Sequence, residues 1–292
     1  MLRIWDRAEH CAFTDLIRFH GEWLCAFREA RDHAGSPGVV RIIGSRDGRT
    51  WSSRALLSER GVDLRDPKLS LMPDGRLILL MGGTGRRERQ PRVCFSANGS
   101  TWTRPARILE PGDWLWRLTW HGSRGYGVSY RLRTRDRWET FLFDTADGLA
   151  YRRICRLDVS GKPNEATLRF THRGDAVALV RREAGDASAW IGTSRPPYEN
   201  WRWHAAGRRA GGPNFLMLPD LRMIAGFRDY RHDGPVTVLA RMTGRSLRPV
   251  LTLPSGGDCS YPGLVWHRGQ LWVSYYSSHE RKTSIYLAKV RL

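Results

Sequence analysis

Lysine is scarce in this chain, and several other features are missing. Only four of the 48 basic residues are lysines, so arginine supplies nearly all of the positive charge. No run of about 18 apolar residues occurs, which excludes a membrane-spanning helix, and the N-terminus lacks the apolar segment of a signal peptide. We therefore expect a cytoplasmic protein by default, with secretion left open. The five cysteines are scattered and never form a C-x-x-C pair, which argues against a disulfide framework or a structural zinc site.

The formal net charge of +19 raises the question of nucleic-acid binding. The arginines are spread along the chain rather than gathered in one stripe, and no recognition-helix pattern accompanies them. We expect a solvated basic surface and no nucleic-acid partner. A basic cleft that attracts an anionic substrate is the sharper alternative.

Repeated hairpin turns are the clearest signal in the sequence. The segment 45–51 reads Ser-Arg-Asp-Gly-Arg-Thr-Trp, a degenerate copy occupies 96–102, and a weaker copy occupies 145–151. Each places Asp-Gly or Asn-Gly between two β-rich runs, which is the strongest short-range hairpin signal. Recurrence of such hairpins predicts a repeat architecture.

A period of 48 or 49 residues runs through the chain. It relates Pro67, Trp116, Asn164, Pro213 and Tyr261, and each unit contains a short strand, a turn and a very apolar second strand. Six such units predict one all-β domain over residues 1–292, a six-bladed β-propeller with four antiparallel strands per blade. The last unit lacks a fourth strand, so we expect residues 2–5 to provide it and close the ring, which removes exposed sheet edges.

The ends of the inner strands and the loops beside them should meet at the mouth of the central channel. Polar and aromatic residues collect at these positions before the inner strands and after the second strands. The candidates for substrate binding are Arg28, Arg65, Asp66, Trp116, Arg117, Arg182, Asn214 and Arg228. Packing remains an alternative for Trp116, and a turn cap remains one for Asp66.

These features resemble the sialidase (neuraminidase) superfamily of six-bladed propellers, whose Asp boxes are similar to the three turn segments. Residues 259–265, Cys-Ser-Tyr-Pro-Gly-Leu-Val, resemble the strand that carries the family's tyrosine nucleophile, and residues 163–168 resemble the strand with its glutamate partner. The resemblance implies that Tyr261 attacks the sugar and that Glu165 takes the phenolic proton. The other interpretation is that Tyr261 caps a strand end and that Glu165 forms a structural pair with Arg182 or Arg228.

One departure from the family pattern affects the expected substrate. The first inner strand reads Cys-Ala-Phe-Thr-Asp at residues 11–15 and has no arginine of the family's carboxylate-binding triad, unless Arg28 or Arg117 replaces it. Asp32 and His33 are rival candidates for the acid/base residue. We expect a monomeric, exo-acting glycoside hydrolase for an acidic sugar, without membrane contact, cofactor or metal. A non-catalytic glycan- or protein-binding propeller and a polysaccharide lyase are the alternatives.

Overall fold

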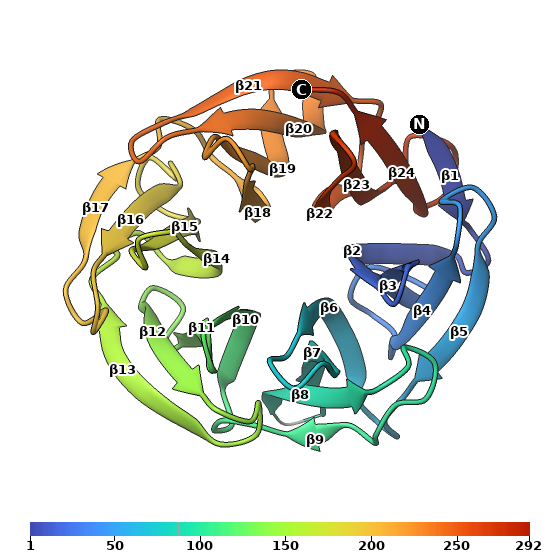
Figure 1. The fold of residues 1–292 in the computed structure, drawn as a ribbon, viewed down its shortest axis with the longest axis horizontal. Coiled ribbons are helices and arrows are strands. Elements are labelled where there is room, and N and C mark those ends of the chain that lie inside the picture. Colours follow the sequence, from blue (N-terminus) through green and yellow to red (C-terminus); the bar gives the residue numbers. More distant parts are fainter. Residues whose placement is uncertain (87) are drawn as a thin grey trace.

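The computed structural model describes residues 1–86 and 88–292, and these form a ring of six four-stranded antiparallel sheets around a central axis (Figure 1). This is the six-bladed propeller that the 48–49-residue period predicts. Its described elements are all strands, and the described residues contain no helix that could cross a membrane.

In blades 1 to 5 the strands run from the axis outward in chain order (Figure 1). Blade 1 contains β2 (His10–Phe19), β3 (Glu22–Ala30), β4 (Val39–Ser45) and β5 (Ser52–Leu57). Blade 2 contains β6 (Asp63–Leu71), β7 (Leu77–Thr84), β8 (Arg89–Ser96) and β9 (Ala106–Arg107). Blade 3 contains β10 (Asp113–His121), β11 (Arg124–Leu132), β12 (Trp138–Thr145) and β13 (Tyr151–Leu157). Blade 4 contains β14 (Pro163–Phe170), β15 (Ala176–Arg182), β16 (Trp190–Ser194) and β17 (Arg202–Ala205).

Blade 5 contains β18 (Gly211–Met217), β19 (Met223–Arg231), β20 (Gly234–Met242) and β21 (Leu247–Leu253). Blade 6 joins β22 (Cys259–His267), β23 (Gln270–Ser277) and β24 (Ser284–Val290) to β1 (Leu2–Trp5) from the other end of the chain. The pairing of β1 with β24 closes the ring as expected, and the two termini lie close together at this blade (Figure 1).

The three repeated turns join the third strand to the fourth in blades 1, 2 and 3. In the first, the Asp47 carboxylate accepts the backbone N–H of Arg49 and Thr50, and the Ser45 hydroxyl accepts that of Gly48. Only the glycine has a positive φ, of 69°. A Cβ on Gly48 would lie 2.3 Å from the Trp272 ring of blade 6. The turn therefore packs directly against the neighbouring blade, which is a structural role.

Every inner strand carries a β-bulge at the same level of the ring. In each blade two residues of the inner strand stand opposite one residue of the second strand, so the alternation of side chains is reset at that point. The bulged pairs are 13–14, 66–67, 116–117, 164–165, 212–213 and 261–262. Bulges re-aim side chains, and these six gather residues that are about 50 positions apart in the sequence.

Candidate functional site

Tyr261 and Glu165 meet at the bulges of blades 6 and 4. The Tyr261 hydroxyl donates a hydrogen bond of 2.6 Å to Glu165 Oε1. Both residues are largely buried, with 8% and 7% of their surface exposed. The sequence predicted that these two residues lie within hydrogen-bond reach, and the structure places them in contact although 96 positions separate them.

Arg181 and Gly212 form further hydrogen bonds with this pair. Arg181 donates from one guanidinium nitrogen to Glu165 Oε2 at 2.7 Å and to the Tyr261 hydroxyl oxygen at 3.0 Å. The Gly212 backbone N–H donates to Glu165 Oε2 at 2.8 Å. A Cβ on Gly212 would lie 2.5 Å from the Tyr261 ring, so any larger residue at position 212 would displace the ring.

The charges around the pair separate the two pKa values. Burial opposes ionisation of Glu165, but the Arg181 charge and the hydrogen bonds from Tyr261, Arg181 and Gly212 outweigh it and lower the pKa of the carboxyl. Burial and the adjacent Glu165 charge raise the pKa of the Tyr261 phenol well above 10. Glu165 is thus a carboxylate, and Tyr261 is a neutral phenol that donates a hydrogen bond to it.

Three further bulges surround the Tyr261 ring. Phe13 packs edge-on against it at 5.2 Å between ring centroids, and Trp116 does so at 5.7 Å. Asp66 of blade 2 is nearly buried, and this burial raises the pKa of its carboxyl despite the nearby Arg65. Phe13, Asp66 and Tyr261 all have positive φ, at 61°, 52° and 50°, which is uncommon for residues other than glycine. Strained backbone of this kind often marks a functional site.

Two partly exposed arginines flank the pair. The Arg65 guanidinium lies 4.9 Å from the centre of the Phe13 ring, and that of Arg228 lies 5.3 Å from the centre of the Tyr261 ring. Their side chains are 18% and 13% exposed, and that of Arg181 is 12% exposed. Three guanidinium groups from blades 2, 4 and 5 therefore face the region beside Tyr261.

Arg182 and Arg28, two of the predicted substrate ligands, lie elsewhere. Arg182 pairs with Pro163 before the bulge, so its side chain turns away from Arg181 and binds Asp186 and the carbonyl oxygens of Ser160 and Ser188. Arg28 is fully buried and donates to Asp63 at 2.7 Å and to two carbonyl oxygens of the loop after β3. The two arginines hold loops and are not available to a ligand.

Arg117, on the bulge of blade 3, and Asn214, directly after the bulge of blade 5, are bound to residues of other blades. Arg117 forms a buried bidentate ion pair with Asp15, with both N–O distances at 2.9 Å. Asn214 donates to the Pro262 carbonyl oxygen and accepts from Arg169, so it joins neighbouring blades. Trp116 is 1% exposed and cannot stack on a sugar. These predicted substrate contacts are parts of the channel packing.

The two acid/base candidates differ in their surroundings. The Asp32 carboxylate accepts from the backbone N–H of Ser36 at 2.9 Å and from that of Gly35 in its own exposed loop. These contacts lower the pKa of Asp32. His33 turns toward the site, where its ring packs edge-on against Phe13 at 5.2 Å and Nδ1 lies 2.7 Å from Asp258 Oδ2.

His10 is also bound to Asp258, a contact that sequence spacing did not reveal. Its Nε2 lies 2.9 Å from the same Oδ2 atom. The prediction of no metal site came from the sequence, where metal-ligand spacing cannot reveal that Asp258, from the far end of the chain, contacts both histidines. Asp258 Oδ1 accepts from Arg228 at 3.1 Å and from Tyr276 at 2.9 Å.

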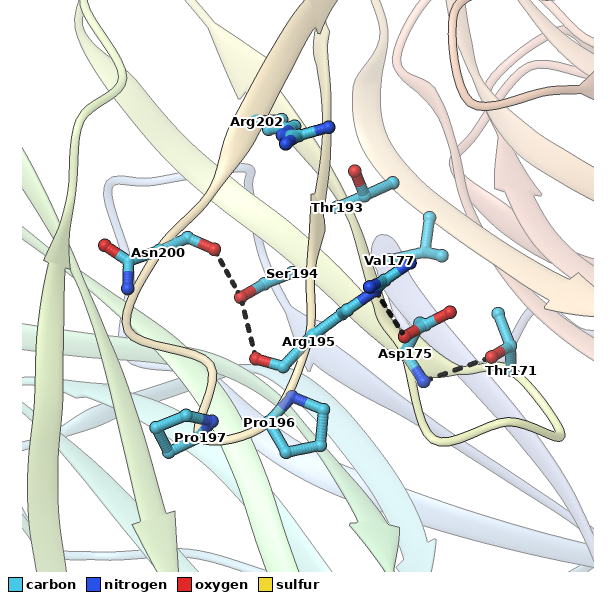
Figure 2. A pocket seen from close by; sticks show the side chains of 10 residues that line it. All are labelled: Thr171, Asp175, Val177, Thr193, Ser194, Arg195, Pro196, Pro197, Asn200 and Arg202. Carbon is cyan, nitrogen blue, oxygen red and sulfur yellow. Dashed lines mark hydrogen bonds and ion pairs between the residues drawn. The ribbon is translucent and has the colours of Figure 1, made fainter.

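A separate hollow of about 570 Å³ lies in blade 4, away from this site (Figure 2). It is lined by the turn after β14, which includes Thr171 and Asp175, and by the segment that follows β16, where the Ser194 hydroxyl donates to the Asn200 carbonyl oxygen at 2.6 Å. Because Glu165 stands near the start of β14 and this turn follows its end, the hollow and the Tyr261–Glu165 pair lie toward opposite ends of the inner strand.

Comparison with known proteins supports the architecture. No protein-family model and no curated protein sequence match the chain. Among solved structures, a protein of unknown function from Dyadobacter fermentans superposes with a TM-score of 0.87 at 19% identity, covering 99% of this chain and 98% of that one. Trypanosoma rangeli sialidase with the inhibitor DANA gives a TM-score of 0.74 at 13% identity, covering 97% of this chain and 55% of that one.

Penicillium chrysogenum α-L-arabinanase complexed with arabinobiose gives a TM-score of 0.75 at 12% identity, covering 99% of this chain and 97% of that one. At these identities the likeness concerns the fold. The chain thus has the six-bladed β-propeller fold that is also found in sialidase and arabinanase glycoside hydrolases.

Proposed function

We propose that this protein is an exo-acting glycoside hydrolase in which Tyr261 is the nucleophile and Glu165 receives its proton. The observation that carries the proposal is the 2.6 Å hydrogen bond between these residues, bridged by Arg181. A neutral phenol is a poor nucleophile unless a base takes its proton. Glu165 is ionised and positioned for that transfer, and Arg181 would stabilise negative charge that develops on the phenolic oxygen.

In the proposed reaction the Tyr261 oxygen forms a bond to the anomeric carbon while the glycosidic bond breaks. The phenolic proton passes to Glu165, and the leaving oxygen takes a proton from a general acid. Water then releases the sugar from the tyrosine. We assign the general acid to Asp66, because burial raises the pKa of this carboxyl and it stands on the bulge of blade 2 at the same level as Glu165 and Tyr261. The carboxylate of Asp32 is occupied by its own loop.

An acidic sugar fits the charges beside the pair. The side chains of Arg65, Arg181 and Arg228 are partly exposed beside Tyr261, and guanidinium groups bind carboxylates in bidentate geometry. Residues 11–15 of the first inner strand contain no arginine, and Arg65 from blade 2 supplies a positive charge over the Phe13 ring. We therefore place the anionic group toward blade 2.

The test is a screen of aryl glycosides with the wild-type protein, Tyr261→Phe and Asp66→Asn. The substrates should include sialosides, uronides and α-L-arabinofuranosides, the last two classes separating an acidic sugar from the neutral sugar of the arabinanase-like neighbours. We expect turnover of an anionic glycoside that Tyr261→Phe abolishes. Unchanged turnover in Tyr261→Phe would exclude the tyrosine mechanism.

The role of Asp66 has its own signature. Asp66→Asn should slow hydrolysis of substrates with poor leaving groups by about 10²–10⁴-fold, the usual contribution of a general acid, and should affect activated nitrophenyl glycosides much less, because these need little protonation. An equal loss on both kinds of substrate would contradict the assignment. Asp32→Asn is the matched control, and its rates should stay near those of the wild-type protein.

A further inference from the structure

His10, His33 and Asp258 form a three-residue cluster at the mouth of the propeller that the proposed hydrolysis does not use. The residues come from the start of β2, from the loop between β3 and β4, and from the segment directly before β22. One potential ligand atom from each lies within 4.8 Å of the other two. Nothing local in the sequence brings them together, since Asp258 is 225 positions from His33 and 248 from His10.

We propose that this cluster binds a divalent first-row transition-metal ion, Zn²⁺ above all. Two imidazole nitrogens and one carboxylate oxygen are a typical donor set for zinc, whereas Ca²⁺ and Mg²⁺ require mostly oxygen ligands. The ligand atoms are His10 Nε2, His33 Nδ1 and Asp258 Oδ2. The two nitrogens stand 2.9 and 2.7 Å from the carboxylate oxygen, so a small outward movement of the side chains would admit an ion between them.

The surroundings hold the carboxylate in position for such an ion. Asp258 Oδ1 accepts from the Tyr276 hydroxyl and from Arg228, and the Asp258 backbone N–H is bound by the Ser278 hydroxyl at 2.9 Å. Hydrogen bonds to the distal oxygen of a ligating carboxylate orient it in metal sites. Among the described residues, the two imidazoles are the hydrogen-bond partners of Oδ2, and it is the atom that they share.

Burial and access also suit a metal centre. His10 is 7% exposed, and its Nδ1 atom is buried without a hydrogen-bond partner among the described residues, so the ring has Nε2 as its one polar contact. The His33 side chain is 50% exposed, which leaves a path for the ion from solvent. Three protein ligands leave at least one coordination position open to water or to an oxygen of a substrate.

The cluster borders the Tyr261–Glu165 pair. Phe13 lies between them, in edge contact with both the His33 and the Tyr261 rings at 5.2 Å, and Tyr276 contacts Asp258 while its ring stands 5.8 Å from that of Tyr261. A bound ion would add positive charge at the rim of the same site. This inference does not depend on the proposed hydrolysis, because it can be tested without a substrate.

The experiment is calorimetric titration of Zn²⁺ into the chelator-treated protein, with Co²⁺ absorption in the visible range as a second readout. We expect one Zn²⁺ per chain and Co²⁺ bands of a four- or five-coordinate site. His33→Ala should lower the affinity at least 100-fold, and Tyr276→Phe should lower it about 10-fold, as loss of an orienting hydrogen bond does. The half-exposed position of His33 makes folding of the first variant straightforward, and thermal unfolding of the metal-free proteins verifies it.

Two controls make the result specific. His279→Ala removes a partly exposed histidine bound to Ser277 outside the cluster and should leave Zn²⁺ binding unchanged. Tyr261→Phe should also bind Zn²⁺ normally, so loss of hydrolysis and loss of metal binding are distinguishable. Absence of stoichiometric binding to the wild-type protein, or equal loss in His33→Ala and His279→Ala, would overturn the proposal.

Discussion

Replacement of Lys68 by methionine should stabilise the protein at neutral pH. Lys68 is 3% exposed in the channel, where its ammonium group donates to the Pro67 carbonyl oxygen at 3.2 Å and lies 4.9 Å from the centre of the Trp116 ring. Burial, followed by the charge of Arg117, lowers the pKa of Lys68 from 10.5 to about 8. At about 1.4 kcal/mol per pKa unit, the folded state loses about 3 kcal/mol by keeping this group charged.

Proton linkage determines how the stability of the wild-type protein changes with pH. Below pH 8 Lys68 is protonated in both the folded and the unfolded state, so the charged group destabilises the folded state by its full amount. Between about pH 8 and 10.5 the folded protein releases the proton while the unfolded chain keeps it, so this contribution makes the wild type more stable as the pH rises. Lys68→Met should therefore exceed the wild type by about 3 kcal/mol at pH 7, and the difference should shrink toward pH 10.5.

Urea unfolding of both proteins from pH 6 to 10.5 measures this difference. Buried thiols such as Cys11, whose pKa burial raises to about 12, destabilise the fold at high pH, but they do so equally in both proteins and cancel in the comparison. Lys282→Met, at a partly exposed loop position, is the control and should show no pH-dependent difference. A constant stability difference between wild type and Lys68→Met across the range would refute the reasoning.

Three further predictions follow from buried contacts. Asp15→Asn leaves Arg117 without its buried counter-charge and should lower the free energy of unfolding by about 3–5 kcal/mol; a loss below 1 kcal/mol by denaturant titration would contradict a dry ion pair. Gly212→Ala places a Cβ 2.5 Å from the Tyr261 ring and should reduce kcat/KM on the order of 10²-fold while the fold persists, as circular dichroism can verify. Because the pKa of Glu165 is lowered, the acidic limb of kcat/KM should lie below pH 4.5 if it reports this group, and an unchanged limb in Glu165→Asp would argue otherwise.

The period of the sequence was sufficient to predict the blades. Strong turns and a buried second strand recur in each unit, and these are local features that a sequence displays directly. The inner strands are harder to delimit from the sequence: β2 starts at His10 and β6 at Asp63, each a few residues before its bulge. The bulge interrupts the apolar–polar alternation, so a continuous strand looks like a loop followed by a shorter strand.

The same bulge explains the error at Arg182. Two consecutive arginines end β15, and the sequence does not tell which one stands opposite the bulged residues of β14. The structure pairs Arg182 with Pro163 and leaves Arg181 opposite the bulge, facing Glu165. Arg28 and Arg117 were misplaced for another reason, since nothing in the sequence shows that Asp63 and Asp15 neutralise them.

The position opposite the bulge also distinguishes blade 4 from the rest of the ring. In the other five blades it holds a fully buried, largely apolar residue, namely Phe27, Met81, Val128, Phe227 and Tyr275. Blade 4 alone places a charged group there, Arg181, and stabilises it with Glu165. A buried charge costs free energy that an apolar side chain at the same position would not. Five blades place an apolar or aromatic side chain at this position, and only the blade beside Tyr261 places an arginine there. A chemical role for Arg181 is the simplest explanation of this difference.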